Sequence, residues 1–133
     1  MWSRLDDALI DHRKVFQAAE IIGPNGGVIA IGLYAMGLMY ANKHLTDGFV
    51  PLSVVRSWTH VADGPAVADA LVRASLWTKT GRHGTPGFLI HDFGNYNPSA
   101  TTIRSQRKRD ADRKAAERKE QKRQQIRRKN GHA

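Results

Sequence analysis

Cationic side chains concentrated between residues 104 and 129 are the part of this sequence best suited to chemistry with another molecule. This stretch holds 13 Lys and Arg against 4 Asp and Glu, and its net charge of +9 equals that of the whole chain. A dense row of cations matches a polyanion such as the phosphate backbone of a nucleic acid. A charged tail that is merely solvated is the alternative. The cations are Arg104, Arg107, Lys108, Arg109, Arg113, Lys114, Arg118, Lys119, Lys122, Arg123, Arg127, Arg128 and Lys129.

A second, smaller set of cations lies in and around a glycine-rich stretch. Residues 81–87 contain three Gly and one Pro, which predicts a long, flexible hairpin tip. Lys79, Arg82 and His83 are expected to follow a phosphate backbone or enter a minor groove there, with few packing contacts of their own. An ordinary solvated hairpin tip is the alternative. Arg73, on the preceding helix, completes the predicted set of DNA-binding residues.

Catalytic chemistry is not indicated by the sequence. It has no Gly-Lys-Ser or Gly-Lys-Thr phosphate loop, no Gly-x-Ser-x-Gly motif, no His-Glu-x-x-His pair and no cysteine. Two groups have the residue types of metal ligands, but caps, turns and surface charge explain them better. These groups are Asp6, Asp7, Asp11 and His12, and His83, His91 and Asp92. We therefore predict a protein that is not an enzyme and has no catalytic residue, metal or cofactor.

The spacing of apolar residues predicts the elements that position these groups. A helix is expected over residues 12–22, with Asp11 as its N-cap. Residues 23–27, Gly-Pro-Asn-Gly-Gly, predict a loop because glycine is conformationally free and proline cannot continue a helix. Residues 28–41 are apolar on every face, which predicts a central helix with neighbours on several sides.

A short strand at 49–50, two helices and a hairpin follow. Pro51 suits the start of the first helix, and the second is expected over about residues 66–75. Strands at 76–80 and 88–93 then form the hairpin. The side chains expected to face the core are Val54, Trp58 and Val61, then Val67, Leu71 and Val72, and finally Phe88 and Ile90.

This order of helix, short strand, two helices and hairpin is that of a winged helix-turn-helix domain, α+β in class and mainly helical. The predicted domain covers residues 1–97. Residues 98–133 predict a basic tail, partly helical or disordered, capped by Asn97 or Ser99 and supported by an i to i+4 pair of Asp110 and Lys114. The tail has no heptad seam, so we expect a lone or fraying helix that becomes ordered on nucleic acid.

Residues 21–41 carry no charge, and a run of that length permits a membrane span. The Gly and Pro residues at 23–27 break the run and leave 14 residues, which is typical of a buried core helix. The first residues include two acids and no signal-peptide pattern, and the lack of cysteine fits a reducing compartment. We therefore expect a cytoplasmic protein with no membrane association. Local hydrogen bonds are expected for His44, His60 and His91.

Short blocks spread over about residues 5–97 form a distinctive combination. They are Leu5-Asp6, His12-Arg13-Lys14-Val15, Tyr40-Ala41-Asn42, His44-Leu45-Thr46-Asp47-Gly48-Phe49-Val50-Pro51, Ala70-Leu71-Val72, Leu76-Trp77 and Gly87-Phe88-Leu89-Ile90-His91-Asp92-Phe93. The combination resembles the N-terminal winged-helix domains of phage replisome-organiser and replication-initiator-like proteins, especially of phages that infect actinobacteria. The resemblance implies a DNA-associated protein of phage or prophage replication.

The resemblance also bears on the end of the predicted fourth helix. Ser75 stands where such proteins tend to have glycine, so a strained, left-handed serine is expected there. That helix offers only Asp69 and Arg73 to a base pair, which predicts core packing in preference to base readout. DNA contacted through its backbone is thus the expected partner, in phage or prophage replication or in gene regulation. RNA, and a replication protein that docks onto residues 1–97, are the alternatives.

Overall fold

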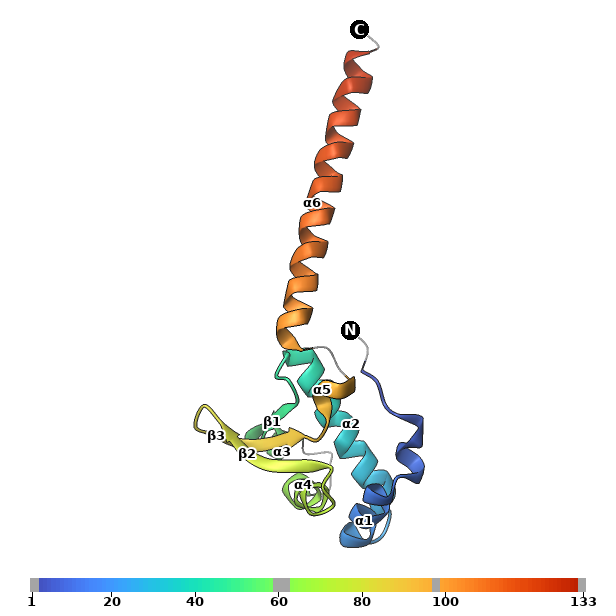
Figure 1. Cartoon of the computed structure of the whole chain (residues 1–133), viewed down its shortest axis with the longest axis vertical. Coiled ribbons are helices and arrows are strands. Elements are labelled where there is room, and N and C mark those ends of the chain that lie inside the picture. Colours follow the sequence, from blue (N-terminus) through green and yellow to red (C-terminus); the bar gives the residue numbers. More distant parts are fainter. Residues whose placement is uncertain (1–2, 59–62, 97–98, 132–133) are drawn as a thin grey trace. The chain divides into compact units, whose positions relative to one another are not determined.

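The computed structural model describes residues 3–58, 63–96 and 99–131, and its contacts divide the chain into two compact units (Figure 1). The first unit is Met1–Asn97 and the second is Pro98–Ala133. The first is α+β and mainly helical, as predicted, and contains a three-stranded sheet. The second contains a single long helix, α6 (Ala100–Asn130).

The first unit opens with a short 3₁₀ helix, η1 (Asp7–Asp11), followed by α1 (Arg13–Ile22). The prediction that Asp11 caps α1 is wrong, because Asp11 belongs to η1. His12 is the N-cap, and its Nδ1 accepts a hydrogen bond from the Lys14 backbone N–H at 3.1 Å. Asp6 caps η1 in the same way, with its Oδ1 accepting from the Ala8 N–H at 2.9 Å.

The central helix α2 (Gly26–His44) is longer than predicted at both ends. The break before it occupies only residues 23–25, and Gly23 and Asn25 take positive φ angles of 96° and 60°. Gly26 belongs to the helix because α1 packs closely there, and a Cβ at this position would collide with the backbone carbonyl of Ala19. The predicted loop is therefore a tight corner between two packed helices.

No single helix among the described residues is long and apolar enough to cross a membrane. Taken together, α1 and α2 reach the required length and composition, but they are bent by 113° at the break between them.

The chain then forms β1 (Phe49–Pro51), α3 (Leu52–Ser57) and α4 (Gly64–Arg73). The predicted single face of Val54, Trp58 and Val61 is wrong, because the helix ends at Ser57 and Val55, not Val54, is fully buried. Trp58 leaves helical geometry with φ −81° and ψ 74°, and Val61 lies outside the described residues. The close approach of Gly64 to the Val55 carbonyl, where a Cβ would lie 2.8 Å away, ties α4 to α3.

The hairpin consists of β2 (Trp77–Arg82) and β3 (Thr85–Ile90), in an antiparallel sheet of order β1-β3-β2. The predicted long tip is wrong, because pairing continues to Arg82 opposite Thr85. His83 and Gly84 close the hairpin with φ angles of 53° and 77°, as a two-residue turn of type I′ requires. β3 ends at Ile90, before a short helix α5 (Phe93–Tyr96), because Asp92 takes a positive φ of 56°.

The core lies between α1, α2, α4 and the inner face of the sheet. Phe88 and Ile90 are buried there, as predicted, together with the fully buried Trp77. The Trp77 ring packs against Gly37 of α2, where a Cβ would lie 2.5 Å from a ring carbon. Ser75, which follows the C-cap of α4, has a left-handed φ of 63° and so carries the strain expected of such a residue at this position. Val67 and Leu71 are buried as expected, whereas Val72 is only partly buried.

Candidate nucleic-acid interface

Helix α6 begins at a local cap and continues through residues of high helix propensity. Ser99 is the N-cap, and its Oγ accepts a hydrogen bond from the Thr102 backbone N–H at 3.1 Å. Lys, Arg, Gln, Glu and Ala, which fill most of the helix, are good helix formers. With 31 residues, α6 extends over about 46 Å at 1.5 Å per residue.

The charges of α6 are not spread evenly around its axis. At 3.6 residues per turn, eight of its cations fall within an arc of about 140° that contains no acidic residue. We call this arc the basic face. It is formed by Arg104, Arg107, Lys108, Lys114, Arg118, Lys119, Lys122 and Lys129.

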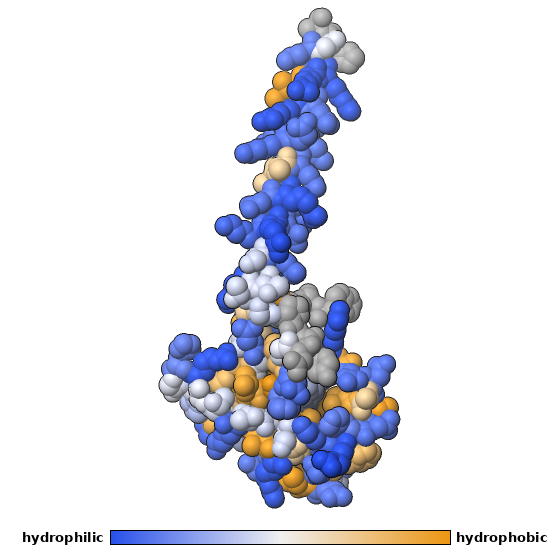
Figure 2. Space-filling model, viewed as in Figure 1, coloured by the Kyte–Doolittle hydropathy of each residue, from blue (hydrophilic) through white to orange (hydrophobic). Residues whose placement is uncertain are grey.

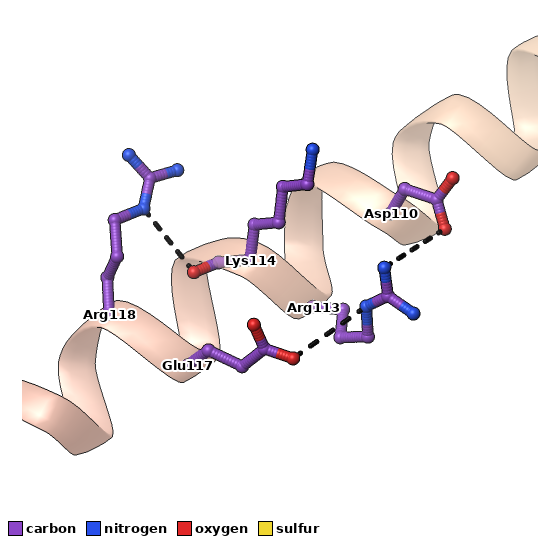
Figure 3. Close-up of polar contacts among 5 residues, drawn as sticks. All are labelled: Asp110, Arg113, Lys114, Glu117 and Arg118. Carbon is purple, nitrogen blue, oxygen red and sulfur yellow. Dashed lines mark hydrogen bonds and ion pairs between the residues drawn. The ribbon is translucent and has the colours of Figure 1, made fainter.

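The rest of the circumference carries the other five cations of α6 and all four of its acids, Asp110, Asp112, Glu117 and Glu120. Arg113 lies there between Asp110 and Glu117, at 3.9 Å from each carboxylate (Figure 3). The predicted pair of Asp110 and Lys114 is wrong, because the branched guanidinium of Arg113 reaches carboxylates on both of its sides. Asp110 and Glu117 thus offset a cation that lies outside the basic face.

Lys114 and Arg118 show that cations of the basic face do not contact the acids of α6. Both project away from Arg113 and Glu117, and the Arg118 Nε donates to the Lys114 backbone carbonyl at 3.3 Å (Figure 3). Within residues 99–131, no cation of the basic face forms an ion pair. Like charges three and four positions apart repel each other along a helix, and bound phosphates would remove that repulsion. Figure 2 shows α6 as an almost continuous hydrophilic surface.

The hairpin presents fewer free cations than the sequence predicted. Lys79 and His83 are exposed, on β2 and in the turn respectively. Arg82 is half-buried, donates a hydrogen bond from a terminal guanidinium nitrogen to the Thr46 carbonyl, and lies over the Phe49 ring at 5.1 Å from its centroid. The expectation that Arg82 has few packing contacts is therefore wrong.

The reason lies in the length of the turn. Because β2 continues to Arg82, this side chain stands at a regular strand position instead of in a flexible loop. It shares the outer face of the sheet with Phe49, whose ring packs against Gly87 of the intervening strand β3. A Cβ at Gly87 would lie 2.8 Å from that ring. Arg82 is thus a structural cap over Phe49 as well as a cation.

Helix α4 offers little to a partner. Its exposed side chains are Pro65, Ala66, Asp69 and Arg73, so Arg73 is its one cation. Arg73 is exposed and lies in the last turn of the helix, where a cation also suits the helix dipole.

Several of the histidines and acids considered as metal ligands serve as caps or form pairs where the structure describes them. In the described part of the chain, no three His, Asp or Glu side chains come together as a metal site would require. Asp6 and His12 act as caps. His91 contacts Asp92 at 3.2 Å, and the His44 ring lies 4.5 Å from that of Tyr40. His60 lies outside the described residues.

The segregation of charge on α6 is the feature that sequence reasoning missed. The signal was present as spacing, because basic-face residues from Arg104 to Lys122 recur at intervals of three, four and seven positions, while the acids fall between them. A count of charges per segment cannot detect such a pattern. Comparison of the chain with family models, curated proteins and solved structures finds no match to any of them.

Proposed function

We propose that this protein binds duplex DNA, without acting as an enzyme, through the basic face of α6. The observation that carries the proposal is the arc of eight cations with no acid and no ion pair. DNA carries one phosphate charge per roughly 1.7 Å of its axis, and Lys and Arg neutralise these charges whatever the base sequence. The 26 residues from 104 to 129 extend over about 39 Å as a helix, which slightly exceeds one turn of B-DNA.

The first unit supports the same proposal through its topology. The order α2, β1, α3, α4, β2, β3, with the sheet order β1-β3-β2, is the order expected of a winged helix-turn-helix domain. In that fold α4 would be the recognition helix and the hairpin the wing. Because α4 has one cation, we propose that Arg73, Lys79 and His83 assist binding, and that base readout is weak. The resemblance noted above supports a role in phage or prophage replication, and we propose the cytoplasm as the location of the protein.

A matched pair of triple variants tests the basic face. Arg104, Arg107 and Arg118 are changed to Gln in one variant, and Arg109, Arg123 and Arg127 in the other, so both lose three charges of the same type. Binding to a fluorescent 30-base-pair duplex is measured by anisotropy at several salt concentrations. The basic-face variant should lose about 2 to 3 from the slope of log affinity against log salt, and the control clearly less.

The outcomes of this experiment are distinct. Equal losses in the two variants would mean that only total charge matters and would overturn the assignment to one face. Tighter binding to a double-stranded RNA of the same length would replace DNA with RNA as the partner. No binding to either duplex at about 50 mM salt would leave α6 without a nucleic-acid role.

A further inference from the structure

A cavity of about 470 Å³ lies within the first unit, apart from every residue proposed above to contact DNA. Five segments meet around it: the chain before α1, α1 itself, α2, the turn between α4 and β2, and the end of β3 with the turn that follows. Sites for drug-sized molecules have volumes of roughly 300–1,000 Å³. The cavity therefore has the size of a small-molecule site.

The inner wall of the cavity is apolar and well ordered by the core. Leu38 of α2, Leu76, Ile90 and Phe93 line it, and each is no more than 7% exposed. Leu9 adds a partly buried side chain from η1. This wall suits a hydrocarbon body, because contact with it removes the apolar surface of the ligand from water.

The two carboxylates at the rim already have partners within the fold. Asp6 accepts the hydrogen bond that caps η1, at 2.9 Å from the Ala8 nitrogen. Asp92 lies 3.2 Å from the His91 Nε2. Both acids therefore take part in contacts within the fold.

Besides these acids, the rim carries three groups that can donate hydrogen bonds, Arg4, His12 and Lys14. His12 accepts at Nδ1, so its neutral ring carries the proton on Nε2. Lys14 uses one N–H on the Ser75 carbonyl, at 3.2 Å, and keeps two. Arg4 forms no hydrogen bond or ion pair with any described residue. A ligand that matches three such groups must supply acceptors and negative charge.

Backbone strain gathers at the same place. Ser75 and Asp92 are both non-glycine residues with left-handed φ angles, 63° and 56°, and both line the cavity. The His91 N–H, which donates to the Leu76 carbonyl at 3.0 Å, joins the two turns. Strain of this kind is frequent where a fold shapes a ligand site.

We propose that this cavity binds a small amphipathic carboxylate. Its hydrocarbon body packs against Leu38, Ile90 and Phe93, and its carboxylate accepts hydrogen bonds from Arg4, His12 and Lys14. The site is independent of DNA binding, since it shares no residue with the basic face.

The test uses the full chain and decanoate as the probe, followed by two-dimensional ¹H–¹⁵N NMR. Decanol, which has the same body without charge, and acetate, which has the charge without the body, are titrated in parallel. Arg4→Gln and Lys14→Gln are compared with Arg13→Gln, a neighbour on α1 that does not line the cavity. Arg4→Gln removes a side chain without a partner in the described structure, so folding should be unaffected even where Lys14→Gln disturbs Ser75.

Decanoate should bind saturably and shift resonances of Leu76, Ile90 and His91, with decanol and acetate roughly tenfold weaker. Arg4→Gln should weaken decanoate binding by a similar factor, and Arg13→Gln should leave it unchanged. The proposal is overturned if decanol binds as tightly as decanoate, if shifts are confined to α6, or if no saturation occurs up to about 5 mM, a concentration at which even weak ligands bind.

Discussion

The two units of this chain leave their cationic side chains in different surroundings. In residues 1–103, 8 cations are balanced by 8 acids, and two of these cations bond to backbone carbonyls of the fold. Lys14 donates to the Ser75 carbonyl, and Arg82 donates to Thr46 and covers Phe49. In α6, Arg113 alone forms ion pairs among the cations of residues 99–131. The contrast teaches that the number of cations alone does not identify a binding surface. It also matters which of those cations already have partners within the protein.

The largest effect that would separate the two units is the salt dependence of DNA binding. The basic face has eight cations, so roughly six to ten phosphates should be neutralised on binding. The affinity of the full chain should then fall by roughly 10³–10⁵ between about 50 and 200 mM salt. A chain ending at Asn97 should lose most of this slope. Anisotropy titrations of both chains on one duplex measure it.

Thermal unfolding of the shortened chain is the control for that comparison. The largest fully buried side chains, Trp77, Leu33, Leu71, Val50 and Val55, all belong to the first unit, so residues 1–97 should unfold cooperatively. A steep salt slope that survives the truncation would move DNA contact to the first unit. A featureless melt of the shortened chain would make the tail part of the folded core.

Arg82→Ala should distinguish a cation used by the fold from one left for a partner. Loss of the contact with the Phe49 ring and of the hydrogen bond to Thr46 should lower the free energy of unfolding by about 1–2 kcal/mol. Lys79→Ala, an exposed cation of the same strand, should change it by less than about 0.5 kcal/mol. Urea unfolding measures both, and equal stabilities of the two variants would return Arg82 to the solvated loop that the sequence predicted.

Ser75→Gly should stabilise the first unit slightly. Relief of the left-handed conformation, worth about 1–2 kcal/mol, is opposed by the larger entropy of an unfolded glycine, so a net gain of about 0.5 kcal/mol is expected. The carbonyl that accepts from Lys14 is kept in this variant. Ser75→Ala, which leaves the strain in place, should bring no such gain in a urea melt, and a gain of equal size would assign the effect to loss of the hydroxyl.

The smallest effect is expected from Glu117→Gln. Its contact with Arg113 is exposed and 3.9 Å long, so the stability of α6, followed by circular dichroism, should change by less than about 0.5 kcal/mol. DNA affinity at low salt should rise a few-fold, because one acid is removed and Arg113 is released. A lower affinity would show that the acids of α6 orient the helix instead of merely offsetting charge.

The order of elements followed from the sequence because apolar spacing reports which faces are buried. The all-apolar segment became α2, and the strand pair around the Gly-rich stretch became β2 and β3. The errors arose where a single local hydrogen bond or turn type determines where an element begins or ends. His12, not Asp11, is the N-cap of α1, and the hairpin closes with a two-residue turn at His83 and Gly84 instead of the predicted seven-residue tip.

For the candidate site, the sequence supplied the residues but not their use. All 13 cations of the tail were identified, yet their division into a basic face and a charge-balanced remainder requires the helical phase of α6. Arg82 was misjudged because its partners, Thr46 and Phe49, lie more than thirty positions away in the sequence. Contacts between such distant residues are set by sheet order, which no local pattern contains.

The two-residue turn at His83 and Gly84 fixes which changes of chain length the hairpin can absorb. Residues added inside the turn leave the pairing of Arg82 with Thr85 intact, so the loop can grow while the sheet below it stays the same. A single residue added within β2 before Arg82 inverts the side-chain alternation and carries the guanidinium to the other face, away from Phe49. Related chains should therefore differ in length at this turn, whereas insertions or deletions of a single residue within β2 should be absent.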